Sequence, residues 1–126
     1  MKPIARPVYL NLLRIHLPLT GWVSILHRLS GVLLFAILPF GVWALSVSLS
    51  DEAGFRRMAS TFAHPLTRLL VLFLIWAFAH HAFAGVRHMA LDAHWGMDLK
   101  RARQSSLVVL LAAGLVTLIA AWELFA

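Results

Sequence analysis

The sequence predicts an all-α membrane protein with three transmembrane helices, and two observations support that prediction. First, 61% of the 126 residues are hydrophobic and 13% are charged, against roughly 45–50% and about 25% in a soluble domain. A body this small has too little interior to hide so much apolar surface from water. Second, three long stretches contain no Asp, Glu, Lys or Arg: 29–50, 69–86 and 104–122. Soluble globular and disordered folds are therefore disfavoured.

The first predicted helix begins near residue 20 and crosses the membrane over about residues 22–50. Pro18 stands just ahead of it, and a proline suits the start of a helix. The uncharged stretch is close to the roughly 20 residues that a helix needs to cross about 30 Å of hydrocarbon. Pro39 lies inside this span and is expected to kink the helix, which membrane helices tolerate.

Two further spans are predicted at about 65–90 and 103–125, around the second and third uncharged stretches. Pro65 again suits a helix start. Between the first two spans, residues 50–60 predict a short helix at the membrane surface. The three spans together are long enough to form one helical membrane domain.

The distribution of Lys and Arg predicts how the spans are oriented. Four of these residues precede the first uncharged stretch and four lie between the second and third, whereas three lie between the first and second and none follows the third. The positive-inside rule then places the N-terminus in the cytoplasm and the C-terminus in the periplasm.

The sequence is thus predicted to consist of two parts. These are a cytoplasmic N-terminal segment, 1–19, and a three-helix transmembrane anchor domain, 20–126.

Charge and cysteine content exclude several classes of protein. The net charge is +6, but the charges sit in short clusters between apolar stretches, a pattern of membrane topology rather than of a nucleic-acid-binding face. No nucleic-acid partner is expected, whereas membrane lipid is an expected partner. The chain has no cysteine, so disulfides, thiolate metal sites and cysteine nucleophiles are excluded. The N-terminal stretch lacks a transit peptide, which favours a multi-pass protein of a bacterial inner (cytoplasmic) membrane.

A polar stripe marks the start of the first span. Ser24, His27, Arg28 and Gly31 fall at i, i+3, i+4 and i+7, and therefore on one face of a helix. Such a face is costly against lipid and should meet protein, a cofactor or water. The alternative is topological: Arg28 snorkels to the headgroups while His27 rests in the interface.

A second polar group lies at the end of the second span. His81, Gly85 and His88 share one helix face, and His80 and Arg87 share the neighbouring one. A neutral imidazole can bind haem iron through Nε2, and a small residue such as Gly85 leaves room for a flat porphyrin. The alternative is a structural histidine that hydrogen-bonds between helices.

The two polar groups are predicted to meet at one depth of the membrane. His81 precedes Arg87 by six residues, or roughly 9 Å along a helix. A haem with its iron near His81 would direct its propionates to Arg28, His27 and Arg87, and arginine pairs well with carboxylates. The third span has neither His nor Met, so a second axial ligand would come from a partner subunit. The residues that converge are Ser24, His27, Arg28, His81 and Arg87.

With these residues in place, the sequence resembles a known family, the cytochrome b membrane-anchor subunit of succinate dehydrogenase (succinate:quinone oxidoreductase, respiratory complex II). The resemblance covers nearly the whole chain, and the paired motifs are far more specific than either alone. The residues that carry it are Arg6-Pro7, Ser24-x-x-His27-Arg28-x-Ser30-Gly31 and His81-x-x-x-Gly85-x-Arg87-His88-x-x-x-Asp92.

The resemblance implies a chain that anchors and positions rather than one that oxidises succinate. It implies a flavoprotein subunit that carries out that oxidation, an iron–sulfur subunit, and a second membrane anchor. One haem b lies between the two anchors with one axial histidine from each, and the substrate quinone is ubiquinone or menaquinone. The chain is then a subunit of an enzyme with no catalytic residue of its own.

The resemblance also assigns roles to individual residues. His81 matches the axial ligand of the haem iron; because His80 stands beside it, His80 is the second choice for that ligand. Ser24 and Arg28 match quinone-binding residues. The haem-binding set is His27, Arg28, His81, Arg87 and His88.

Three other functions are consistent with parts of this pattern. A fumarate reductase anchor shares the architecture and runs the reaction in reverse. A haem-free structural anchor would use the histidines only for packing. A small transporter would use His80 and His81 as a proton relay, but the outer halves of the spans are almost purely apolar, which argues against it.

Overall fold

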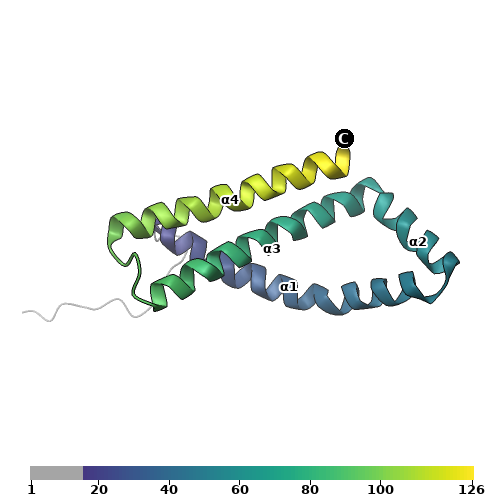
Figure 1. Cartoon of the computed structure of the whole chain (residues 1–126), viewed down its shortest axis with the longest axis horizontal. Coiled ribbons are helices and arrows are strands. Elements are labelled where there is room, and N and C mark those ends of the chain that lie inside the picture. Colours follow the sequence, from purple (N-terminus) through teal and green to yellow (C-terminus); the bar gives the residue numbers. More distant parts are fainter. Residues whose placement is uncertain (1–15) are drawn as a thin grey trace, which may run out of the picture.

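The computed structural model describes residues 16–126, and these residues form four α-helices (Figure 1). The predicted Arg6-Pro7 motif and most of the N-terminal segment 1–19 lie outside the described residues. The helices are α1 (Leu19–Ser50), α2 (Glu52–Ala63), α3 (Pro65–Asp92) and α4 (Leu99–Phe125).

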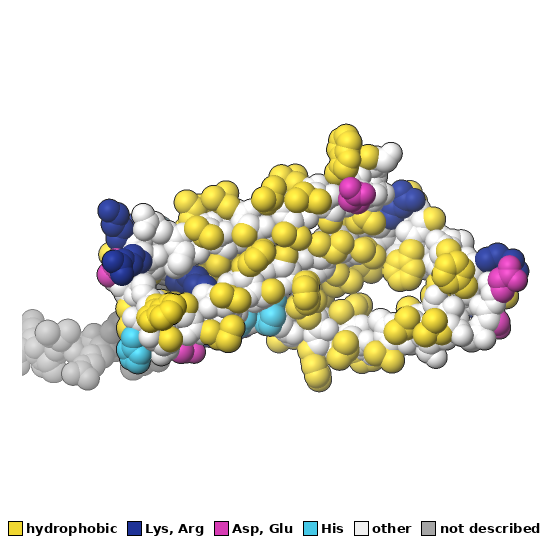
Figure 2. Space-filling view, viewed as in Figure 1, with side chains coloured by type: hydrophobic (Ala, Val, Ile, Leu, Met, Phe, Trp, Pro, Cys, Tyr) yellow, Lys and Arg dark blue, Asp and Glu magenta, His cyan; other side chains and the backbone are white. Residues whose placement is uncertain are grey.

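The expected all-helical fold is confirmed, and three of its helices are candidate membrane spans. The helices α1, α3 and α4 are each long and apolar enough to cross a membrane, with mean hydropathy values of 2.3, 2.0 and 2.3 over their most apolar windows. Residues at both ends of the helices are charged, while apolar side chains cover the length between them (Figure 2). α1 continues through Pro39 as one helix.

Local sequence explains where the helices begin. Pro18 precedes the first turn of α1. Asp51 caps α2, since its carboxylate accepts a hydrogen bond from the Gly54 N–H at 2.6 Å. His64 caps α3 by accepting from the Leu66 N–H at 3.3 Å. α2 is the short helix expected after the first span, and it joins α1 to α3 at the end of the molecule far from the α3–α4 connection (Figure 1).

The three long helices pack through small residues. α3 lies between α1 and α4 (Figure 1), and Ala77 and Ala84 of α3 are fully buried together with Ala113 of α4. Small side chains let helix backbones approach closely, which is how membrane helices associate. Val23 and Val109 complete this core. Most large apolar side chains remain on the outside, as expected of helices that face lipid or partner subunits.

Two arginines tie α3 to α4, one at each end of the pair. Arg68 Nη1 donates to the carbonyl of Leu124 at 2.8 Å, which satisfies one of the free carbonyls at the end of α4. Arg87 Nε donates to Ser105 Oγ at 3.0 Å, and Arg87 Nη2 donates to the carbonyl of Ala102 at 3.3 Å. These bonds fix the register of the two helices.

The end of α3 is a Schellman motif. The N–H of Trp95 donates to the carbonyl of Ala90 and the N–H of His94 donates to that of Leu91, both at 2.9 Å. His94 takes a φ of 64°, the left-handed conformation that this motif requires and that glycine adopts most easily.

Replacement of His94 by glycine is therefore expected to stabilise the chain. The left-handed conformation costs a non-glycine residue about 1–2 kcal/mol, and part of that is offset by the greater freedom of an unfolded glycine, so the expected gain is about 0.5–1 kcal/mol. Thermal unfolding of the detergent-purified complex measures this gain in stability. His64→Gly is the matched control, because His64 has an ordinary φ of −67°; that variant should unfold slightly earlier. Equal shifts in both variants would contradict the prediction.

Candidate functional site

Three imidazoles gather between α1 and α3. The rings of His27 and His81 are stacked, with centroids 4.3 Å apart and an interplanar angle of 15°. The ring of His88 lies 5.0 Å from that of His27. We call His27, His81 and His88 the histidine cluster. The two motifs that the sequence places at one depth are thus brought into contact through these three side chains.

The Nδ1 atom of His81 is held by α1. It lies 3.1 Å from the carbonyl oxygen of His27 and 3.3 Å from Ser30 Oγ. A carbonyl oxygen only accepts hydrogen bonds, so Nδ1 carries the proton and donates it. Ser30 is buried and its hydroxyl donates to the same carbonyl at 2.9 Å. In a neutral imidazole with its proton on Nδ1, the lone pair is on Nε2, and Nε2 makes no hydrogen bond with the described residues.

Glycines on both helices provide the space for these rings. A Cβ at Gly31 would lie 2.9 Å from His81 Cε1 and 3.4 Å from His81 Nδ1. A Cβ at Gly85 would lie 3.5 Å from His27 Nε2. Gly31 therefore cannot take a side chain unless the ring of His81 moves, whereas Gly85 leaves ordinary contact distance.

His80 occupies a different environment from its neighbour. Its side chain is 0% exposed and stacks on the indole of Trp76, with ring centroids 5.6 Å apart. Neither ring nitrogen has a hydrogen-bond partner among residues 16–126. A step of one residue turns a helix by about 100°, so His80 points into the three-helix core while His81 points to α1.

The remaining predicted site residues divide into two groups. On α1, Ser24 is half-buried and Arg28 is exposed, and Arg28 forms no ion pair within the described part of the chain. Both lie within one turn of His27. Arg87, expected to join the same cluster, instead directs its guanidinium to Ser105 and Ala102 of α4.

Sequence reasoning missed the residues that orient His81. Ser30 belongs to the first motif, but its role as a partner of Nδ1 did not follow from its spacing. The carbonyl of His27 has no side-chain signature at all. Among the described residues no group of three or more His, Asp or Glu side chains is placed to hold a metal ion. Of the two ring nitrogens of His81, Nε2 is the one that is not held by a hydrogen bond to the described residues.

Comparison with known proteins gives a family match and several relatives. The family model described as "Succinate dehydrogenase/Fumarate reductase transmembrane subunit" matches residues 2–121. The chain is similar to the succinate dehydrogenase cytochrome b556 subunit of Coxiella burnetii, with 31% identity over 82% of this chain and 84% of the relative. It is also similar to the cytochrome b556 subunit of Paracoccus denitrificans (29%, over 80% and 78%) and the cytochrome b560 subunit of Reclinomonas americana (28%, over 97% and 88%).

Proposed function

The chain belongs to the succinate dehydrogenase/fumarate reductase transmembrane subunit family, and from this premise we propose that its histidine cluster forms one side of a haem b site. The chain is a cytochrome b anchor subunit of succinate dehydrogenase and thus one subunit of that enzyme complex. The names of its relatives, cytochrome b556 and b560, support haem b as the cofactor. They also favour succinate dehydrogenase over a fumarate reductase and over a haem-free anchor.

The observation that carries the haem proposal is the contact of His81 Nδ1 with α1. Histidines that bind metals almost always donate their other ring N–H to a carbonyl or carboxylate, which orients the ring and raises the basicity of the ligating nitrogen. The Nδ1 contacts of His81 with His27 O and Ser30 Oγ provide this arrangement. His81 is therefore the proposed axial ligand. His80 is not proposed as the ligand, because its side chain is fully buried within this chain.

Cationic and polar groups of the same end of α1 and α3 would hold the propionates. We assign this role to His27, Arg28 and His88, since Arg28 is exposed and forms no ion pair within residues 16–126, and arginine binds carboxylates strongly. Arg87 takes no part in this proposed site because its guanidinium is bonded to α4. When bound, haem b supplies one-electron redox chemistry. The second axial histidine would come from the second membrane-anchor subunit.

Quinone binding is the second part of the proposal. The Ser24 hydroxyl would donate a hydrogen bond to a carbonyl oxygen of ubiquinone or menaquinone. Arg28, one turn further along α1, would stabilise the negative charge that develops on the quinone oxygen as it is reduced. Succinate oxidation belongs to the flavoprotein subunit, and electrons would arrive through the iron–sulfur subunit.

The proposed setting is a bacterial inner membrane. The segment 1–19 would lie in the cytoplasm, and 20–126 would form the anchor domain with the C-terminus in the periplasm. The histidine cluster and Arg28 would then lie near the cytoplasmic face. That end is where the soluble subunits would dock.

Substitution of Ser24 or Arg28 is expected to impair quinone reduction while the oxidation of succinate by the flavoprotein subunit continues. Loss of a hydrogen bond to a charged group costs about 1.5–3 kcal/mol, so Arg28→Gln should lower kcat/KM for a soluble ubiquinone analogue roughly 10–100-fold. Ser24→Ala should lower it about 5–10-fold, because a neutral hydrogen bond contributes about 1 kcal/mol. Steady-state kinetics of the purified complex measure both effects.

Two controls separate this result from a general loss of assembly. Succinate oxidation with a soluble artificial electron acceptor should be unchanged, because that acceptor bypasses the membrane anchor. Arg56→Gln removes an exposed arginine at the opposite end of the molecule, where it pairs with Glu52 at 2.5 Å, and should leave quinone kinetics unchanged. Wild-type quinone kinetics in Arg28→Gln would remove Arg28 from the proposed quinone site.

A further inference from the structure

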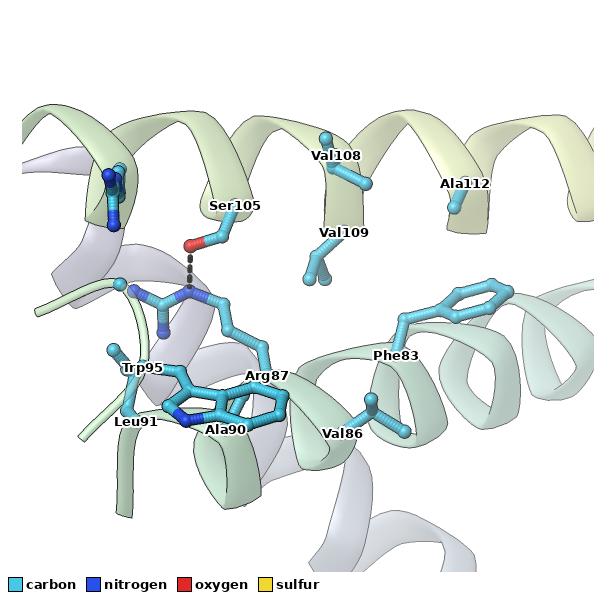
Figure 3. A pocket seen from close by; sticks show the side chains of 12 residues that line it. Phe83, Val86, Arg87, Ala90, Leu91, Trp95, Ser105, Val108, Val109 and Ala112 are labelled. Carbon is cyan, nitrogen blue, oxygen red and sulfur yellow. Dashed lines mark hydrogen bonds between the residues drawn. The ribbon is translucent and has the colours of Figure 1, made fainter. Parts of the chain in front are cut away.

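A groove between α3 and α4 lies outside the proposed haem and quinone site. Its volume is about 380 Å³, within the range of about 300–1,000 Å³ that is usual for sites of small ligands. Apolar side chains of both helices line most of it, while Arg87 and Ser105 stand at one end (Figure 3). Val86 and Val108 are 61% and 63% exposed. The groove is thus open toward the surroundings of the bundle.

The guanidinium at the end of this groove is a buried charge without a counterion. Arg87 is 8% exposed. Its hydrogen bonds go to a hydroxyl and a carbonyl, both neutral, and use two of its five N–H donors. Within residues 16–126 no carboxylate lies within ion-pair distance of it; Asp98, at the same end of the molecule, pairs with Arg101 at 3.3 Å. A buried charge left in this state is costly, and an anion would relieve that cost.

The depth of Arg87 indicates what kind of anion would reach it. Arg87 precedes the end of α3 at Asp92 by five residues, about 7.5 Å along the helix. The polar headgroup layer of a bilayer is about 5–7 Å thick on each side. With the end of α3 at the membrane surface, the guanidinium would lie where headgroups meet hydrocarbon. Trp95, which lies beside it in Figure 3 and is 75% exposed, is a typical residue of that level.

We propose that the α3–α4 groove binds one anionic phospholipid, with its phosphate on Arg87 and one acyl chain along the apolar part of the groove. The charge of Arg87 selects an anion, and the three free N–H donors suit phosphate oxygens. Phe83, Val108 and Ala112 provide the surface for the acyl chain. Ser105 orients the guanidinium by accepting from Nε.

The test uses the whole complex, purified in detergent, with retained lipids identified by native mass spectrometry. Ala112→Phe fills the groove and leaves Arg87 in place, and Arg87→Gln removes the charge. Each should lower the amount of retained anionic phospholipid at least threefold. Leu118→Phe, on an exposed part of α4 outside the groove, and Arg56→Gln are the matched controls and should retain the wild-type amount. If the Arg87→Gln complex fails to assemble, the result for Ala112→Phe decides the question alone. A wild-type amount of anionic phospholipid in Ala112→Phe would overturn the proposal.

Two further measurements identify the source of the anion and the occupant of the groove. Phosphatidylglycerol added to the delipidated complex should raise its Tm by several degrees, and by more than phosphatidylcholine does. An equal rise in Tm with phosphatidylcholine, or with inorganic phosphate alone, would overturn the proposal. A photoreactive benzoylphenylalanine at position 108 should become linked to a phospholipid. A link to another protein chain would show that a partner helix fills the groove, and would also overturn it.

Discussion

Replacement of His81 by alanine is expected to abolish the b-type haem spectrum of the complex, whereas replacement of His80 is expected to leave it. His81 presents Nε2 with its other nitrogen bonded to α1, so its loss removes the proposed iron ligand. His80 is buried in the core against Trp76, and its loss leaves a cavity there. His80→Ala should therefore lower thermal stability by about 1–3 kcal/mol and keep the haem.

The reduced-minus-oxidised optical difference spectrum of each purified complex measures the haem. The two variants are matched, because they remove the same side chain from adjacent positions of one helix. Loss of the haem spectrum only in His80→Ala would assign the iron ligand to His80 instead of His81. A full spectrum in both variants would show that this chain does not ligate the iron.

Replacement of Gly31 by alanine is expected to have the second largest effect, although this residue has no side chain to contribute. The new Cβ would lie 2.9 Å from His81 Cε1, so the imidazole must shift and its Nδ1 contacts with α1 must lengthen. Loss of such orienting contacts typically lowers metal affinity about 10–100-fold. Haem content per complex should therefore fall at least severalfold, with a changed absorption maximum in whatever haem remains.

Gly41→Ala is the control for this variant. Gly41 belongs to the same helix, and a Cβ built there meets nothing within 4 Å. The effect of the substitution on helix propensity is the same at both positions, so any difference reports the contact with His81. Ser30→Ala should give a smaller loss of haem than Gly31→Ala. Normal haem content and an unchanged spectrum in Gly31→Ala would contradict the orientation described for His81.

The spans were predictable because the bilayer imposes a simple constraint. A helix that crosses hydrocarbon must stay apolar for about 20 residues, and the three uncharged stretches lie inside α1, α3 and α4. Pro18 and Pro65 marked two of the helix starts for a local reason, since proline fits the first turn. These features depend on the neighbouring sequence alone.

The meeting of His27 with His81 was predictable from depth, but the direction of Arg87 was not. Both neighbouring faces of α3 carry polar residues at the same level, and α3 has α1 on one side and α4 on the other. Which face meets which helix depends on how the three helices wind around one another. Helical spacing gives the angle between Arg87 and His88, but it does not give the arrangement of the bundle.

The contacts that orient His81 were hidden for a different reason. One of them is a backbone carbonyl, which every residue possesses, and the other is a serine hydroxyl that also bonds to that carbonyl. Neither role follows from residue type or spacing. The space opposite Gly31 is likewise a property of two helices together. Such contacts appear only when the packed structure is known.

The most direct test of the central claim, that His81 Nε2 binds the haem iron, is chemical rescue of His81→Gly with imidazole. Removal of the side chain leaves a space of the size of the missing ring, which free imidazole can enter to supply the lost nitrogen. We expect the complex of His81→Gly to lack the b-type spectrum and to regain it when imidazole and haem are added, while His80→Gly needs no rescue. Recovery by imidazole in His80→Gly, with an intact spectrum in His81→Gly, would contradict the claim.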